Sequence, residues 1–352
     1  MKKKIVFIVN PISGAQQKSV ILSQIERAID TSKFDFEIVK TAYAGHATQI
    51  AKEAVSNGVD IVCAVGGDGT VNETARALLH TNTALAIIPC GSGNGLARHL
   101  HIPIDPIRAA ELIGEGCVQD IDYGLVNDKP FFCVCGVGFD AHVSMKFAEA
   151  GRRGPITYVE NVIKSLKYAP REYELEIYNG EDVRKATYKA FLISCANASQ
   201  YGNNAYIAPQ ASVRDGVMDV TIIEPFNFID APIIAVQLFN GTIDKNVRIK
   251  TFRCDKLIIN RKKPGAMHSD GEPSKADCRV VVEIIKGGLK CVCPQNEGVR
   301  EFGDNIQSMI EEQVSNLRIR SEQMLLSTKQ TQRRIATMNK NVLDKVGKVK
   351  IR

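Results

Sequence analysis

Short β-branched runs alternate with longer amphipathic segments from Lys4 to about residue 118. The strand-like runs are Lys4–Val9, Phe34–Thr41, Asp60–Val65 and Ala84–Pro89, and the helix-like segments follow Gly14, follow Gly45 and span Val71–His80. This alternation predicts an open, mostly parallel α/β sheet with right-handed crossovers. Because ligands of such sheets bind beyond the carboxyl ends of the strands, functional residues are expected there.

Beyond about Val118 the pattern changes to a succession of strand-like runs. They are Phe131–Val137, Tyr173–Tyr178, Tyr188–Ala196, Met218–Ile223, Lys256–Asn260 and Val280–Ile285, with helical patterns only at Ile156–Tyr168 and Phe228–Phe239. This succession predicts a second, mainly antiparallel β domain.

After Pro294 the chain contains no further proline, and weak heptad spacing of its apolar residues predicts a helical tail. Ten Lys or Arg and two acids lie between Arg318 and Arg352, a net charge of +8; the whole chain carries +6, so the rest carries −2. A basic helix can touch an anionic membrane surface, pair with a second copy in a homodimer, or remain a solvated appendage. We therefore predict three segments, 1–124, 125–294 and 295–352.

At 352 residues, with 44% hydrophobic and 24% charged residues, the chain matches a globular protein of two domains and a tail. The apolar run Ile5–Val9 is too short for a secretory signal, and no segment approaches the roughly 20 apolar residues that span a bilayer. We expect a cytoplasmic protein, at most peripheral at the membrane, with no nucleic-acid partner.

The ten cysteines lie in or beside apolar runs, including Cys133-Val134-Cys135 and Cys291-Val292-Cys293. Alternate residues of a strand share a face, so each of these pairs is expected to fill one side of a sheet. No Cys-x-x-Cys spacing occurs, which favours reduced structural thiols over a metal site.

Four glycine-containing turns follow the predicted strands of the first domain: Asn10–Gly14, Gly45–Ala47, Gly66–Thr70 and Gly91–Gly95. On one edge of the sheet, missing Cβ atoms let phosphate oxygens approach backbone N–H groups, and helix N-termini supply partial positive charge. Asp68 can then reach a Mg²⁺ ion that bridges the phosphates. Taken alone, Asn10–Gly14 or Gly45–Ala47 is most simply a tight loop, whereas Gly-Gly-Asp-Gly-Thr after a buried strand is far more specific. No Walker A lysine motif is present, and no dinucleotide-binding glycine motif is convincing.

Further motifs extend this set in order from about Lys4 to Pro294. The full set is Asn10-Pro11-x-Ser13-Gly14, Thr41, Gly45–Ala47, Gly66–Glu73, Pro89–Arg98, Asp122, Gly136-x-Gly138-Phe139-Asp140, Gly154 with Tyr158, Asp215-Gly216 and Asp270-Gly271-Glu272. Together they resemble the diacylglycerol kinase catalytic-domain family, which includes sphingosine and ceramide kinases and bacterial lipid kinases.

The resemblance implies an α/β nucleotide-binding domain, a β-sandwich lipid-substrate domain and a nucleotide in the cleft between them. The γ-phosphate of ATP would pass to the hydroxyl of a lipid partner at the membrane surface, diacylglycerol or a sphingoid base. The implied ATP contacts are Asn10, Ser13, Gly14, Thr41, Gly66, Gly67, Asp68, Gly69, Thr70, Asn72, Glu73, Ser92 and Asn94. Gly95 replaces an acid that many diacylglycerol kinases have, as in the sphingoid-base kinases, which leaves the lipid class open.

In the second domain the resemblance implies a Mg²⁺ site at the Asp215 side chain and the carbonyl groups of Ser212 and Val217, in addition to Asp68. An Asp-Gly turn between two strands is the alternative interpretation of this segment.

Asp270-Gly271-Glu272 resembles the catalytic segment of the family, in which a carboxylate accepts the proton of the acceptor hydroxyl. Asp270 is favoured as the base because it is the shorter acid and directly precedes a flexible glycine, with Glu272 as the alternative. The alternative interpretation of this segment is an Asp-Gly hairpin turn without a catalytic role. For His268 and His46 we expect a surface or capping role rather than proton transfer.

Two other functions remain open. An NAD kinase shares a Gly-Gly-Asp-Gly loop and a two-domain plan, but the Asn-Pro-x-Ser-Gly and Gly-Ser-Gly-Asn segments favour a lipid kinase. A nucleotide-binding regulatory protein without catalysis is disfavoured because Asp68, Asp215 and Asp270 are all present.

Overall fold

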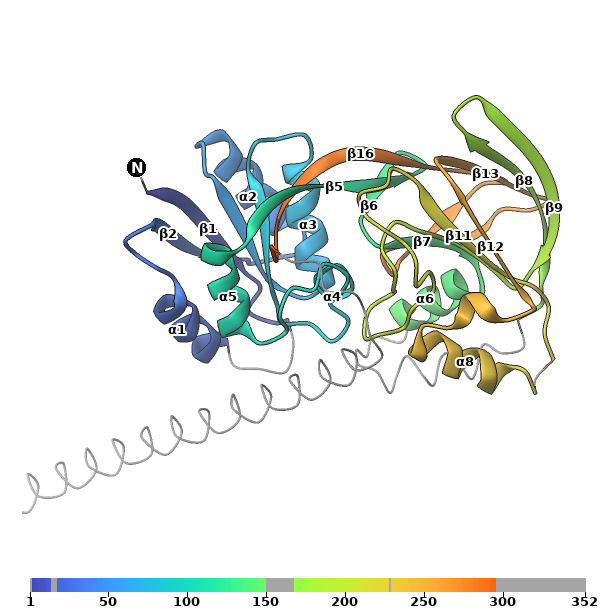
Figure 1. Ribbon diagram of the computed structural model, residues 1–352, viewed down its shortest axis with the longest axis horizontal. Helices are drawn as coiled ribbons and strands as arrows, with labels where there is room; N and C mark the ends of the chain where they lie inside the picture. The colour runs from blue at the N-terminus through green and yellow to red at the C-terminus, as the bar shows by residue number, and fades with distance from the viewer. Residues whose placement is uncertain (1, 14–17, 150–167, 228, 296–352) are drawn as a thin grey trace, which may run out of the picture.

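The computed structural model describes residues 2–13, 18–149, 168–227 and 229–295 (Figure 1). Several expectations lie outside these residues: the role of Gly14, the helical pattern before Tyr168, the motif positions Gly154 and Tyr158, and the basic tail helix.

The first part of the chain is an α/β structure in which β2-β1-β3-β4 form a parallel sheet. Its elements are β1 (Lys3–Val9), α1 (Lys18–Ala28), β2 (Phe34–Lys40), α2 (His46–Ser56), β3 (Ile61–Gly66), α3 (Asp68–Leu78), β4 (Ala84–Pro89), α4 (Gly95–His99) and α5 (Pro106–Glu115). β3 and β4 are buried along their whole length, as expected for strands covered on both faces. α1 packs beside α5 and α2 beside α3, on opposite faces of the sheet because the crossovers run in opposite directions (Figure 1).

The second part is a β-sandwich. Its elements are β5 (Cys117–Val126), β6 (Lys129–Phe131), β7 (Val134–Gly138), α6 (Phe139–Glu149), β8 (Arg171–Asn179), β9 (Asp182–Ala190), β10 (Leu192–Ala196), β11 (Met218–Ile223), α8 (Ala231–Asn240), the 3-10 helix η1 (Ile243–Lys245), β12 (Ile249–Cys254), β13 (Lys256–Arg261), β14 (Gly265–Ser269), β15 (Glu272–Ala276) and β16 (Arg279–Cys293). A six-stranded antiparallel sheet, in the order β12-β11-β10-β7-β14-β15, shares an apolar core with β8, β13 and β16. The predicted fold class is confirmed.

β16 pairs with strands of both parts of the structure. It pairs with β13 and β5, and near its end Cys291 pairs with Leu85 of β4. A ten-stranded sheet therefore runs through both parts, and β16 bridges them in Figure 1. The predicted boundary after residue 124 lies within β5 and stays a prediction.

Several element predictions differ from the structure, for example in the run Phe131–Val137, which is divided between β6 and β7. The run Tyr188–Ala196 is not one strand, because β9 and β10 belong to different sheets and the chain bends between them at Phe191. The backbone N–H of Phe191 donates to the carbonyl of Ile223 and its carbonyl accepts from Phe139, so the bend is hydrogen-bonded. The third helix begins at Asp68 rather than at Val71, so the acid belongs to the first helical turn.

All ten cysteines lie among the described residues and are free thiols. Cys291 and Cys293 share one core as expected, but Cys133 and Cys135 do not. Cys133 precedes β7 and packs into the core of the α/β part, whereas Cys135 packs inside the sandwich.

In the described part of the chain, no helix has the length and apolar character needed to cross a bilayer.

Candidate functional site

Two glycine-rich loops meet at the carboxyl ends of β3 and β4. Gly66 and Gly67 lead from β3 into α3, and Gly91 follows β4. A Cβ atom on Gly91 would lie 2.6 Å from the Cα atom of Gly67, closer than Cβ contacts come in proteins. Glycine at both positions therefore lets the two loops touch through their backbones.

Asp68 joins these loops through its side chain. Its Oδ1 atom accepts the backbone N–H of Gly95 at 2.7 Å, and its Oδ2 atom accepts that of Asn94 at 2.9 Å. Burial raises the pKa of Asp68, and the two backbone donors oppose this shift. A carboxylate oxygen can accept more than one partner, so a metal contact at Asp68 is compatible with its present bonds.

Asn94 and Arg98 hold the second loop from within. Asn94 has a left-handed backbone (φ 51°), and its side chain accepts from the Gly91 N–H at 3.0 Å and donates to the Gly91 carbonyl at 2.8 Å. The buried Arg98 donates from Nε to the Gly93 carbonyl at 3.1 Å. Arg98 is not among the predicted contact residues, although a cation one turn into a helix after a glycine loop is a recognisable signal.

The turn after β1 lies against the start of α3. Asn10 donates from Nδ2 to Thr70 Oγ1 at 3.2 Å, and Ser13 donates from Oγ to the Asn10 carbonyl at 3.1 Å. The Thr41 N–H donates to the Val9 carbonyl at 2.9 Å, which places the end of β2 at the same edge. The structure thus brings these four predicted contact residues to the edge where the glycine loops meet.

Three other predicted contacts in the first domain differ in exposure and in position. Gly69 and Ser92 are exposed at this edge. Glu73 lies further along α3, where its carbonyl accepts a hydrogen bond from Thr48 Oγ1 at 2.8 Å.

Asp270 connects the β-sandwich to the α/β part. It lies in the turn between β14 and β15 with a left-handed backbone (φ 47°). Its Oδ1 atom accepts the N–H groups of Cys133 and Val134 at 2.8 and 3.1 Å. Its Oδ2 atom accepts the Phe132 N–H at 2.8 Å and Nδ2 of the buried Asn72 from α3 at 3.1 Å. Burial raises the pKa of Asp270, and the three backbone donors oppose this shift.

Glu272 has a more open environment. Its side chain is 56% exposed, and its Oε2 atom lies 3.3 Å from Nη2 of Arg76 on α3. Both residues line a cavity of 220 Å³ together with Lys129. Glu272 is thus reachable from solvent, whereas the Asp270 carboxylate has four protein donors.

The predicted second metal loop directly precedes β11 and lies against β5. The Asp215 Oδ2 atom lies 3.8 Å from the guanidinium of Arg253, which also pairs with Asp219 at 3.1 Å. Within the described residues, no three His, Cys, Asp or Glu side chains gather closely enough to hold a metal ion. A carboxylate that already faces a guanidinium fits Mg²⁺ poorly. The assignment of Ser212, Asp215 and Val217 stays a prediction, and no step of the reaction is built on it.

Asp122 fixes this loop and is not among the predicted site residues. It is buried, and its oxygens accept the N–H groups of Gly216 at 2.8 Å and Gly287 at 2.7 Å. Asp122 belongs to the motif set given above, and its burial within β5 shows that it holds this loop in place.

The two histidines differ. His46 accepts the Ala42 N–H at 3.0 Å, and its ring stacks on Tyr43, which agrees with a local capping role. His268 is only 1% exposed, and its Nε2 atom lies 3.0 Å from Asp140 Oδ2, so the surface role expected for it is wrong. His268 is the next to last residue of β14, and its side chain is buried against Asp140 of α6.

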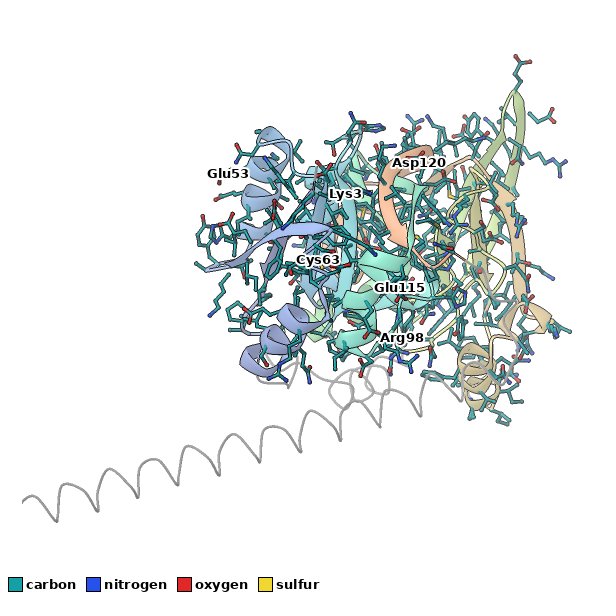
Figure 2. All side chains as sticks on the ribbon, turned by 60° about the vertical axis from the view of Figure 1, so that its left-hand side comes forward. Lys3, Glu53, Cys63, Arg98, Glu115 and Asp120 are labelled. Atoms are coloured by element: carbon teal, nitrogen blue, oxygen red, sulfur yellow. The ribbon has the colours of Figure 1, made fainter. Side chains whose placement is uncertain are left out.

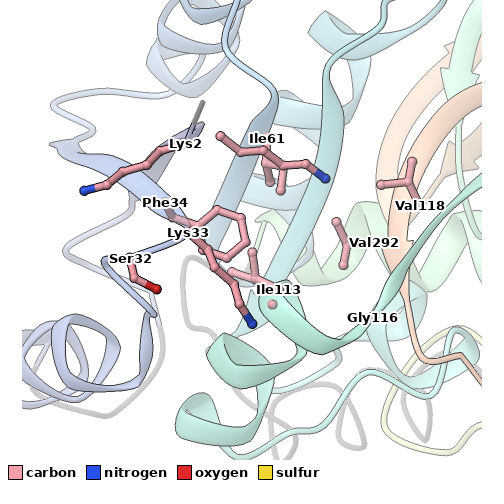
Figure 3. Close-up of a pocket in the computed structure, with 11 residues that line it drawn as sticks. Lys2, Ser32, Lys33, Phe34, Ile61, Ile113, Gly116, Val118 and Val292 are labelled. Atoms are coloured by element: carbon pink, nitrogen blue, oxygen red, sulfur yellow. The ribbon is translucent and has the colours of Figure 1, made fainter.

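A larger cavity, of 680 Å³, lies at the opposite end of the parallel strands (Figure 3). Lys3, Phe34 and Ile61, at the amino ends of β1, β2 and β3, line it. In Figure 2 Lys3 lies above Cys63 of β3 and Arg98 lies below it, on the other side of this strand. The cavity is therefore remote from the glycine loops and contributes nothing to them.

Comparison with known proteins agrees with this arrangement. Residues 4–126 match the family model described as the diacylglycerol kinase catalytic domain, and residues 133–293 match the YegS C-terminal NAD kinase β-sandwich-like domain. A diacylglycerol kinase of Bacillus subtilis (strain 168) is 29% identical over 280 residues, which cover 77% of this chain and 90% of the relative. One of Staphylococcus saprophyticus is 25% identical over 284 residues, with shares of 77% and 90%.

Solved structures agree as well. A Bacillus anthracis protein assigned as a diacylglycerol kinase has a TM-score of 0.69 and 25% identity, covering 83% of this chain and 96% of that one. The two family models together span both parts of the described fold, and the chain belongs to the diacylglycerol kinase catalytic-domain family.

Proposed function

We propose that this protein is an ATP-dependent lipid kinase that transfers the γ-phosphate to a lipid hydroxyl at a membrane surface. The observation that carries the proposal is the joining of the two glycine loops by Asp68, next to the Asn72–Asp270 contact with the β-sandwich. Backbone N–H groups at a helix start and two glycine loops in backbone contact suit a polyphosphate.

The triphosphate is proposed to lie over the starts of α3 and α4. There Gly69 leaves the first turn of α3 open, since a Cβ atom on it would meet nothing within 4 Å, and the dipole of α3 favours negative charge. The nucleotide would enter as its Mg²⁺ complex, in which the metal ion neutralises phosphate charge, with Asp68 as the protein contact. The loops themselves orient the γ-phosphate toward the β-sandwich.

The acceptor hydroxyl is proposed to lie beside Glu272. Here the proposal departs from the preference for Asp270, because four donors occupy the Asp270 carboxylate and it holds the backbone of residues 132–134. Glu272 is exposed and lies on the cavity that Arg76 and Lys129 also line. A carboxylate there can accept the hydroxyl proton while positioning the oxygen for attack on phosphorus.

Diacylglycerol is the first acceptor to test, since the named relatives are diacylglycerol kinases, and a sphingoid base is the second. NAD is the competing acceptor, since the family model for the sandwich is described as NAD kinase-like.

The test incubates the purified chain with γ-labelled ATP and, separately, diacylglycerol, sphingoid base, ceramide, monoacylglycerol, phosphatidylglycerol or NAD. Thin-layer separation should show label in a lipid product. Label in NAD alone would replace the lipid assignment, and ATP binding without transfer to any acceptor would favour a regulatory protein.

A further inference from the structure

Helix α8 and the turn after it carry an unusual share of the exposed apolar surface. Five of the nine exposed large hydrophobic residues in the described chain lie here: Ile229, Ile233, Val236, Phe239 and Val247, with exposed fractions of 82%, 55%, 63%, 55% and 86%. No charged residue occurs between Ala231 and Asn240. Exposed helix faces of globular proteins are normally polar, so this face is suited to an apolar partner.

The opposite face of α8 anchors the helix to the protein. Ile234 is buried and Leu238 packs against the core, one helical turn apart. Asp230, before the helix, pairs with Arg248 at 3.0 Å, which fixes the segment at both ends. The apolar face is therefore held outward on a rigid support.

α8 is also linked to the glycine loop of the candidate site. The Tyr206 N–H donates to the Leu238 carbonyl at 2.8 Å, and in the same segment the Asn203 N–H donates to the Gly93 carbonyl at 2.8 Å. A Cβ atom on Gly202 would lie 3.0 Å from Gly93, so this segment lies directly on the loop. Whatever binds α8 is thus brought close to the candidate site.

We propose that the apolar surface of α8 (Ile233, Val236 and Phe239) and of the segments on either side of it (Ile229 and Val247) inserts into the surface of a lipid bilayer and so positions the site above its lipid substrate. The inference rests on the proposed lipid acceptor. A second copy of the chain is a weaker occupant, because a stable interface uses roughly 20 to 30 residues a side. Shallow insertion into the interface of a bilayer needs only one apolar helix face.

The first measurement is sedimentation of the full chain with vesicles of phosphatidylcholine and phosphatidylglycerol, without ATP. The double variant Ile233→Glu with Phe239→Glu should lower the vesicle affinity about tenfold or more, because charge replaces inserted apolar side chains. Val183→Glu on β9 is the control, since Val183 is 49% exposed and the tip of the β8–β9 hairpin is at the top of Figure 1, whereas α8 is at the bottom. It should bind vesicles as the wild type does.

Hydrogen exchange of the wild type should show protection of residues 229–247 when vesicles are added. If the double variant proves unstable, Ile233→Ser with Val236→Ser replaces it and should show the same direction of change. Equal binding by the wild type and by folded α8 variants overturns the proposal. So does a wild-type dimer that the variants dissociate, or a tail that becomes protease-sensitive in them, because a second copy or residues 296–352 would then cover the face.

Neither readout needs turnover. Vesicle binding through α8 without label in any lipid would leave the insertion of α8 into the bilayer standing and remove the proposed function. Label in detergent-dispersed lipid, with unaltered vesicle binding by the variants, would support the proposed function and overturn the insertion of α8.

Discussion

At the scale of residues, the acids of the site act as connectors as much as chemical groups. Asp68 joins two loops of one sheet, and Asp270 joins α3 to the backbone before β7. The motif around Asp68 lies at the end of the buried strand β3, as predicted, and the role of Asp68 stays a prediction. The sequence could not separate Asp270 from Glu272, because their difference lies in donors from residues 132–134 and 72, more than 130 positions away.

The first prediction separates these two acids. Glu272→Gln should leave the free energy of unfolding nearly unchanged and lower turnover by roughly 10² to 10⁴, the range for loss of general-base help. Asp270→Asn should instead lower the free energy of unfolding by about 1 to 3 kcal/mol, because its amide NH₂ would face backbone donors. Urea unfolding and turnover at saturating ATP measure both. A stable Asp270→Asn without turnover, beside an active Glu272→Gln, would return the role of base to Asp270.

The second prediction concerns pH. The pKa values of Asp68 and Asp270 are raised by burial, so acidification protonates both above the ordinary pH range of an Asp carboxyl. Protonation weakens the bonds from the backbone N–H groups, and activity should fall. Because the folded state binds these protons more readily than the unfolded state, the two groups themselves favour folding as the pH falls through this window. A pH–rate profile beside circular dichroism should show activity lost before structure; simultaneous loss would contradict this reading.

At the scale of elements, the four parallel strands of the α/β part followed from periodicity, because buried parallel strands are apolar runs, whereas α4 and α5 were not predicted. The positions of β14 and β15 in the sandwich did not follow from periodicity. β14 and β15 are short and polar, with Pro273 and Lys275 in β15, and they exist through pairing with β7 and with each other. β16 continues beyond the predicted strand Val280–Ile285. The prediction ended too early because Gly287 and Gly288 interrupt the apolar pattern at the point where the register shifts.

The third prediction tests the contact between the glycine loops. Gly91→Ala places a methyl group 2.6 Å from the backbone of Gly67 and should cost about 1 to 3 kcal/mol, with weaker nucleotide binding. Gly69→Ala is the matched control, since a Cβ atom there meets nothing within 4 Å and lies in a helical turn. It should be neutral or stabilising by up to about 1 kcal/mol. Equal thermal stability of the two variants would argue against close packing of the loops.

At the scale of the whole molecule, the ten-stranded sheet makes the two parts mechanically continuous through β5 and β16. Linear division of the sequence cannot show this, because the last strand returns to the first domain. The apolar face of α8 was equally hidden, since the run Phe228–Phe239 reads as a buried helix until its surroundings are known.

The fourth prediction concerns the tail. Deletion of residues 296–352 should preserve the fold and turnover on detergent-dispersed lipid, because every candidate site residue precedes the deletion. Turnover on anionic vesicles should fall, since each basic residue near such a surface contributes about 1 kcal/mol of binding. Loss of soluble expression would show instead that the tail belongs to a core or a dimer.

The most direct test of the central claim is phosphoryl transfer by Asp68→Ala. The claim is that the glycine loops joined by Asp68 bind the triphosphate of a lipid kinase. With γ-labelled ATP and diacylglycerol in detergent micelles, the wild type should yield labelled lipid. Asp68→Ala, with its fold verified by circular dichroism, should transfer at least about 10² times more slowly, because the proposed contact to Mg²⁺ and the hydrogen bonds that join the two loops are both lost. Full transfer by the variant with unchanged Mg²⁺ dependence would contradict the account.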